Sequence, residues 1–109
     1  MDYSISPAAL DIKGEDWTVV RDILTRLVPT YDIWAFGSRV TGKAKQYSDL
    51  DLVVISDKPL SFADYATLKE AFDESDLPYR VDIVDWAAAT SSFREIIQKN
   101  KVIIQSKTL

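Results

Sequence analysis

The chain has 109 residues, no cysteine, no histidine and a formal net charge of −4 at pH 7. These counts exclude disulfides, thiolate nucleophiles, zinc sites built on cysteine or histidine, and any mechanism that uses a histidine base. A bound metal would need oxygen ligands, which favours magnesium or manganese, and the acidic balance argues against binding of bulk nucleic acid.

The length suits one domain and leaves little room for a second. Hydrophobic residues make up 47% of the chain, which is enough for a packed core. We therefore expect a single domain over residues 1–109, in which residues 1–13 form a peripheral segment. No apolar run approaches the ~20 residues that span a bilayer, and the first residues do not resemble a secretory signal. A cytoplasmic protein without a membrane segment is expected.

Apolar spacing and turn residues predict helices and strands along the whole chain. In chain order, we expect helix 15–27, strand 31–36, a turn or short helical piece 38–47, strand 50–55, helix 62–75, strand 80–85, a helix from residue 92, and strand 101–105. Ser61 and Ser92 each begin a capping box, which marks the start of the helix behind it. The last segment could also extend the helix before it.

The topology follows from the lengths of the connections. The turn between the first two strands is too short for a crossover helix, so these strands are expected to be antiparallel and the sheet mixed. Short strands covered by helices favour a two-layer α/β domain.

Gly37 and Ser38, after the first predicted strand, indicate a turn at which a short helical piece begins. Backbone N–H groups at such a turn favour an anion, the Ser38 hydroxyl can donate to a phosphate, and glycine allows close approach. Arg39, Lys43 and Lys45 add a local basic cluster. A Gly-Ser pair is often only a turn, and a basic cluster is often only a solvated loop, so these alternatives stay open at this point.

Asp49 and Asp51 open the next strand, in which residues two apart share a face at a spacing of ~6.6 Å. Two carboxylates at the rim of an apolar layer repel each other and lose hydration, and a divalent cation would relieve both costs. The alternative is an ordinary strand start, in which one aspartate caps the turn and the other is solvated.

Asp82 interrupts the apolar strand 80–85, and alternation puts it on one face with Arg80 and Val84. A carboxylate in this position needs a cation, a hydrogen-bond donor or water. A metal ligand and a salt bridge to Arg80 both meet that need. The position of Asp85 at the end of the strand indicates a structural role for this residue.

Together these residues resemble the nucleotidyltransferase family related to DNA polymerase beta. The family pattern is Gly-Ser, a further glycine, Asp-x-Asp and a separate carboxylate, and it is met here by Gly37, Ser38, Gly42, Asp49, Asp51 and Asp82. The match covers about residues 30 to 105, and the size resembles the minimal branch of the family, the MNT proteins. One departure is Val40-Thr41, where many relatives have alanine and arginine, which puts a role for a second arginine in doubt.

The resemblance implies a polymerase beta-like α/β fold, with a small mixed sheet packed against about three helices. It implies a pair of magnesium ions, with manganese as a substitute, held by Asp49, Asp51 and Asp82. ATP or another nucleoside triphosphate would be bound by the turn and the first aspartate pair, at Gly37, Ser38, Arg39, Asp49 and Asp51. One ion would stabilise the leaving pyrophosphate, and the other would activate an acceptor hydroxyl that attacks the α-phosphorus.

The resemblance also implies a partner, because the chain is too short to carry a separate acceptor-binding domain. Minimal members of the family often act as antitoxins of a small helical partner of the HEPN type. The implied reaction is transfer of AMP from ATP to a partner tyrosine within a hetero-oligomer, which silences an RNase. Two alternatives remain: a nucleotide-binding subunit of a two-chain transferase that modifies a small molecule, and a non-catalytic module that neutralises its partner by stoichiometric binding.

Overall fold

Four strands form one mixed sheet in the order β3-β2-β1-β4. The computed structural model describes residues 7–107. The strands are β1 (Asp32–Phe36), β2 (Leu50–Ile55), β3 (Val81–Asp85) and β4 (Val102–Gln105). β1 is antiparallel to both β2 and β4, whereas β2 and β3 are parallel. The predicted mixed sheet and its antiparallel first pair are confirmed, and the last segment is a strand.

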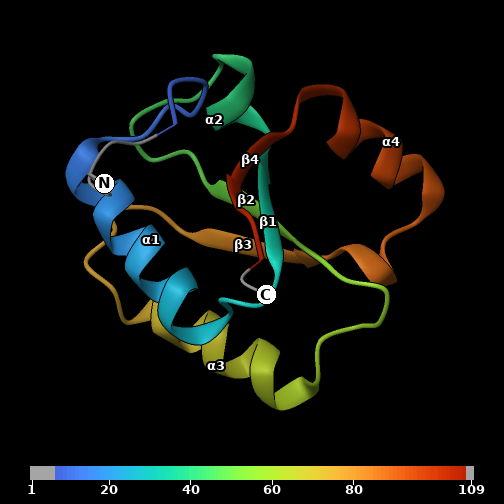
Figure 1. Cartoon of the computed structure of the whole chain (residues 1–109). Helices are drawn as coiled ribbons and strands as arrows, with labels where there is room; N and C mark the ends of the chain where they lie inside the picture. Colours follow the sequence, from blue (N-terminus) through green and yellow to red (C-terminus); the bar gives the residue numbers. More distant parts are fainter. Residues whose placement is uncertain (1–6, 108–109) are drawn as a thin grey trace.

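Helices cover both faces of this sheet (Figure 1). α1 (Gly14–Leu27) and α3 (Phe62–Asp73) pack on one face, and α4 (Ser91–Asn100) packs on the other. The short helix α2 (Ser38–Thr41) follows β1, and a single 3-10 turn, η1 (Trp86–Ala88), follows β3. The fold therefore has three layers, and the prediction of two layers is wrong. The third layer is α4, whose apolar side packs on the face of the sheet that α1 and α3 leave uncovered.

Strand β2 lies at the centre of the fold and contributes to both cores. Leu50, Leu52 and Val54 point into the main core under α1 and α3, and Val53 points into the smaller core under α4. All four side chains are at most 1% exposed. Burial on both faces explains the nearly continuous apolar run of this strand.

The starts of α3 and α4 differ in how well the sequence predicts them. At α3 the Ser61 hydroxyl accepts a hydrogen bond from the Asp64 N–H at 3.0 Å, as predicted. At α4 the cap is Thr90, whose hydroxyl accepts from the Phe93 N–H at 3.2 Å. The predicted cap at Ser92 is wrong because Thr90, two residues earlier, already caps the helix that begins at Ser91.

The N-terminal segment packs more closely than predicted. Residues 1–6 of the expected peripheral segment 1–13 lie outside the described residues. Leu10 is buried in the main core, and the Asp11 N–H donates to the Arg39 carbonyl at 2.7 Å. Within residues 7–107, no helix is long and apolar enough to cross a membrane.

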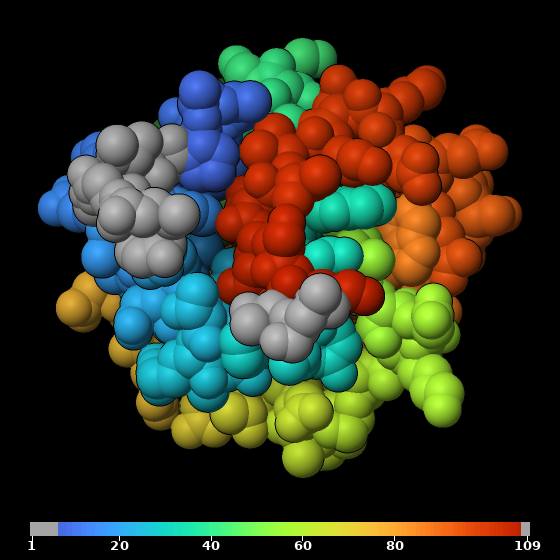
Figure 2. All heavy atoms as spheres, in the orientation of Figure 1, coloured from blue at the N-terminus to red at the C-terminus, as the bar shows by residue number. Residues whose placement is uncertain are grey.

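Strand β4 forms one edge of the sheet and lies at the molecular surface. The space-filling view shows it between α1 and α4 (Figure 2). Ile103 of this strand is exposed, whereas Ile104 packs against the main core. The opposite edge is β3, which carries Asp82.

Candidate active site

Two of the predicted aspartates lie directly opposite each other on neighbouring parallel strands. Asp51 of β2 is the register partner of Asp82 of β3. Paired residues on adjacent strands lie about 5 Å apart and project from the same face. The next pair on that face, Val53 and Val84, belongs to the smaller core under α4. Asp51 and Asp82 therefore share the face of the sheet that α4 covers.

The third aspartate, Asp49, is linked to Asp82 by Arg80, which forms an ion pair with each of them. One Nη of Arg80 lies 2.9 Å from Oδ2 of Asp49, and its Nε lies 3.3 Å from Oδ1 of Asp82. The side chain of Arg80 is 62% exposed, and those of Asp49 and Asp82 are 38% and 43% exposed. The salt bridge to Asp82 was one of the alternatives that the sequence left open, whereas the contact to Asp49 depends on the pairing of β2 with β3.

Burial and the two neighbouring carboxylates both act on the pKa of Asp51. Burial, followed by the charges of Asp82 and Asp49, raises the pKa of Asp51 from 3.8 to about 6, and Arg80 acts in the opposite direction. A carboxyl group with such a pKa gains from a nearby cation, because the cation offsets both the lost hydration and the repulsion.

Gly37 allows the turn after β1 to lie against the carboxylate of Asp51. Phe36, the last residue of β1, pairs with Asp51, and Gly37 follows with φ +81°. A Cβ atom at position 37 would overlap Oδ2 of Asp51. Ser38 is the first residue of α2. Its backbone N–H therefore belongs to the first turn of a helix, where N–H groups have no acceptor within the helix. The structure thus adds a reason for glycine here: it leaves room for the carboxylate of Asp51.

The donor set fits a hard divalent cation, although the carboxylates are not arranged as a finished metal site. Within residues 7–107, no three acidic side chains are close enough together to share a metal ion. The three aspartates nevertheless offer only oxygen donors, and two of them, Asp49 and Asp82, already contact one cation, the guanidinium of Arg80. Small rotations of exposed carboxylates, together with loss of the arginine contacts, would be needed for a metal to bind.

Arg39, for which the resemblance implied a phosphate contact, is buried and hydrogen-bonded within the chain. Its side chain is 5% exposed. Its three nitrogens donate to the carbonyls of Ser48, Asp11 and Gln46 at 2.9, 3.0 and 3.1 Å, and the guanidinium lies 3.9 Å from the ring centre of Tyr79. Arg39 therefore ties the N-terminal segment to the loop that leads into Asp49.

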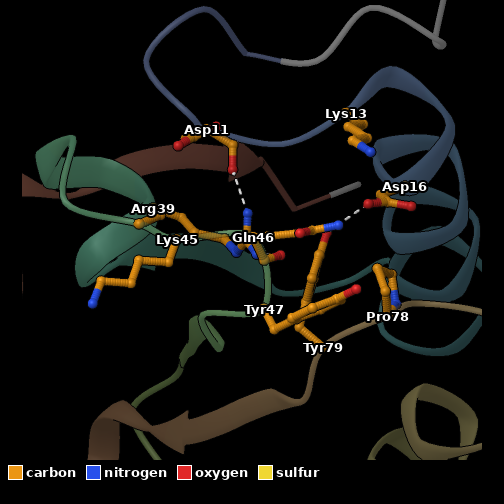
Figure 3. Close-up of a pocket in the computed structure, with 10 residues that line it drawn as sticks. Asp11, Lys13, Asp16, Arg39, Lys45, Gln46, Tyr47, Pro78 and Tyr79 are labelled. Atoms are coloured by element: carbon orange, nitrogen blue, oxygen red, sulfur yellow. Dashed lines mark hydrogen bonds between the residues drawn. The ribbon is translucent and has the colours of Figure 1, made fainter.

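Arg39 also lines a pocket of about 300 Å³, in which its hydrogen bond to Asp11 is visible (Figure 3). The other lining residues include Lys13, Asp16, Lys45, Gln46, Tyr47 and Tyr79. The Tyr79 hydroxyl donates to Asp16 at 3.2 Å, and burial together with the Asp16 charge raises the pKa of Tyr79 above its usual range. None of the three site aspartates lines this pocket. Lys43 and Lys45 of the predicted basic cluster lie exposed in the loop after α2.

Replacing Arg39 by lysine should destabilise the protein by about 2–4 kcal/mol, because the three donors of an ammonium group sit on one atom and cannot reach three carbonyls arranged around a planar guanidinium. Thermal denaturation followed by circular dichroism measures the change. Arg26→Lys is the matched control, since Arg26 is 59% exposed on α1 and its ion pair is a 3.8 Å contact to the exposed Asp22. A normal melting temperature combined with weakened nucleotide binding would contradict the structural role of Arg39.

The chain is similar in sequence to a curated relative and to a family model. It is 61% identical over 100 residues to a probable protein adenylyltransferase of Haemophilus influenzae, MntA, and the alignment covers 92% of this chain and 88% of the relative. Residues 20–108 match the family described as polymerase beta, nucleotidyltransferase.

Solved structures have the same fold at lower identity. A toxin–antitoxin complex with AMP-PNP gives a TM-score of 0.68 at 23% identity, covering 84% of this chain and 73% of that chain. A tri-AMPylated HEPN toxin of Shewanella oneidensis in complex with its MNT antitoxin gives a TM-score of 0.59 at 20% identity, covering 84% and 69%. The family match spans most of the chain, and the paired aspartates beside a glycine–serine turn lie within it. The chain belongs to the polymerase beta nucleotidyltransferase family.

Proposed function

We propose that this chain is a magnesium-dependent protein adenylyltransferase, which transfers AMP from ATP to a hydroxyl group of a small HEPN-type toxin and so acts as its antitoxin. The observation that carries the proposal is the register pairing of Asp51 with Asp82, with Asp49 and the Gly37 turn beside them. The relative that is 61% identical supports a protein as the acceptor. Since ATP is a cytoplasmic substrate, the proposal includes a cytoplasmic location.

Nucleotidyltransferases of this kind generally use divalent metal ions. In the proposal, Asp49, Asp51 and Asp82 hold a pair of magnesium ions, and manganese can replace magnesium. When bound, such ions neutralise the triphosphate and lower the pKa of the acceptor hydroxyl. The oxygen-only donor set and the raised pKa of Asp51 support this assignment.

The residues of the chain then bind and orient the reactants. The Ser38 hydroxyl and the first N–H groups of α2 hold the β- and γ-phosphates, and Gly37 keeps the turn close to Asp51. The acceptor oxygen forms a bond to the α-phosphorus, the bond from that phosphorus to the β-phosphate oxygen breaks, and pyrophosphate leaves. Asp82, on the exposed side of the pair, takes the proton of the acceptor hydroxyl.

The test is to purify the protein with its natural partner and incubate the complex with α-labelled ATP and magnesium. We expect label on the partner protein, and no label after EDTA treatment or with Asp49→Ala. Label on a small molecule alone would favour a two-chain transferase. Full neutralisation of the partner by Asp49→Ala would favour stoichiometric binding.

A further inference from the structure

Arg80 contacts two of the three aspartates that the proposed function assigns as metal ligands. It immediately precedes β3, and its guanidinium contacts Asp49 at 2.9 Å and Asp82 at 3.3 Å. It occupies one oxygen of each carboxylate, so a metal ion that binds those carboxylates comes within a few ångströms of a fixed positive charge. Because Arg80 is 62% exposed, these contacts are weak and can be broken.

The sign of the charge on the incoming ligand decides whether Arg80 helps or hinders its binding. A free divalent ion carries two positive charges and is repelled by the guanidinium. A divalent ion bound to a nucleoside triphosphate belongs to a complex with net negative charge, and its phosphate oxygens can accept hydrogen bonds from the same guanidinium. The effect of one arginine therefore changes sign between the two ligands.

We propose that Arg80 makes the site selective for the metal–nucleotide complex over the free metal ion, by opposing the second and favouring the first. This inference rests on the proposed function, since it takes the three aspartates as the metal ligands. Arg80 is a specificity-determining residue in this account. Among the described residues, Asp51 is the site aspartate with which Arg80 forms no ion pair.

Two titrations of the purified protein test the inference without measuring activity. Free Mn²⁺ is titrated and followed by electron paramagnetic resonance, and α,β-methylene ATP, whose α–β bridge cannot be cleaved, is titrated calorimetrically in excess Mn²⁺. For Arg80→Gln we expect Mn²⁺ alone to bind about fivefold more tightly, from a screened interaction of unit and double charges about 5 Å apart. The metal–nucleotide complex should bind about fivefold more weakly. Both changes should shrink at high salt.

Three further variants separate charge from shape and from general surface effects. Arg80→Lys keeps the charge, so its free Mn²⁺ affinity should stay close to that of the wild type. Arg26→Gln removes an arginine of similar exposure, 59%, from the other face of the sheet and should change neither titration. Asp51→Asn should remove Mn²⁺ binding, which locates the ion at the proposed site.

The outcomes also separate this inference from the proposed function. If Arg80→Gln shifts both affinities in the same direction, or weakens binding of free Mn²⁺, Arg80 only positions the carboxylates and the inference is overturned. If Mn²⁺ binds the wild type and Asp51→Asn equally, the metal site itself is wrong, and the proposed function fails with it.

Discussion

Asp51→Asn should abolish AMP transfer and at the same time stabilise the metal-free protein. The loss of transfer is expected to reach about 10³-fold, because a neutral amide cannot replace the carboxylate that the proposed function assigns as a metal ligand. Transfer is measured with α-labelled ATP and the partner protein. This combination of effects is expected of a residue whose charge serves the reaction at the expense of the fold.

The gain in stability follows from the raised pKa of Asp51. That pKa is about 6 in the folded protein, against an ordinary value of 3.8. The folded state therefore binds the proton more tightly than the unfolded state, and ionised Asp51 lowers the free energy of unfolding above about pH 6. Below about pH 4 the carboxyl is protonated in both states, and this penalty disappears. Allowing for partial exposure, we expect Asp51→Asn to add about 1–2 kcal/mol near pH 8.

Thermal denaturation in the presence of EDTA, followed by tryptophan fluorescence, measures this gain. The advantage of Asp51→Asn over the wild type should grow from about pH 4 to about pH 6, stay level at higher pH and reach roughly 5–10 °C. Asp22→Asn is the control, because Asp22 lies on α1 with a side chain that is 71% exposed. A variant no more stable than the wild type at the higher pH would contradict the raised pKa.

Gly37→Ala should also abolish transfer, but by distorting the site. The backbone of Gly37 has φ +81° and ψ −157°, a region that other residues rarely adopt. The new methyl group would collide with the carboxylate of Asp51. Backbone strain alone should cost about 1–3 kcal/mol. Displacement of Asp51 by about 1 Å should lower the transfer rate by about 10²-fold.

Gly42→Ala is the matched control for this substitution. Gly42 also has a positive φ, +79°, but within residues 7–107 no heavy atom beyond its chain neighbours lies within 4 Å of the Cβ position. It should lose about 1 kcal/mol from the left-handed backbone and keep most of its activity. Melting temperatures and transfer rates of both variants make the comparison. Equal loss of transfer in the two variants would show that backbone strain, and not the contact with Asp51, makes Gly37 necessary.

The order of helices and strands was predictable because each element carries its own local signal. Trp17, Val20 and Ile23 recur at helical spacing on the buried side of α1. The apolar run of β2 and the Ser61 cap of α3 are equally local. The layer to which α4 belongs has no such signal. It depends on which face of the sheet remains uncovered once α1 and α3 have packed.

The residues of the site divide in the same way. Sequence alone determined their types, their order and the spacing of Asp49 and Asp51, which lie two residues apart at the start of β2. Only the tertiary structure decided that Asp51 faces Asp82, because parallel pairing of β2 with β3 joins segments about 30 residues apart. The tertiary structure also decided that Arg39 is buried and donates a hydrogen bond to the carbonyl of Asp11, 28 positions away. It likewise placed Arg80 between two aspartates that are 33 residues apart. Side-chain type and spacing belong to the local chain, whereas burial and charge pairing depend on which distant segments meet when the core forms.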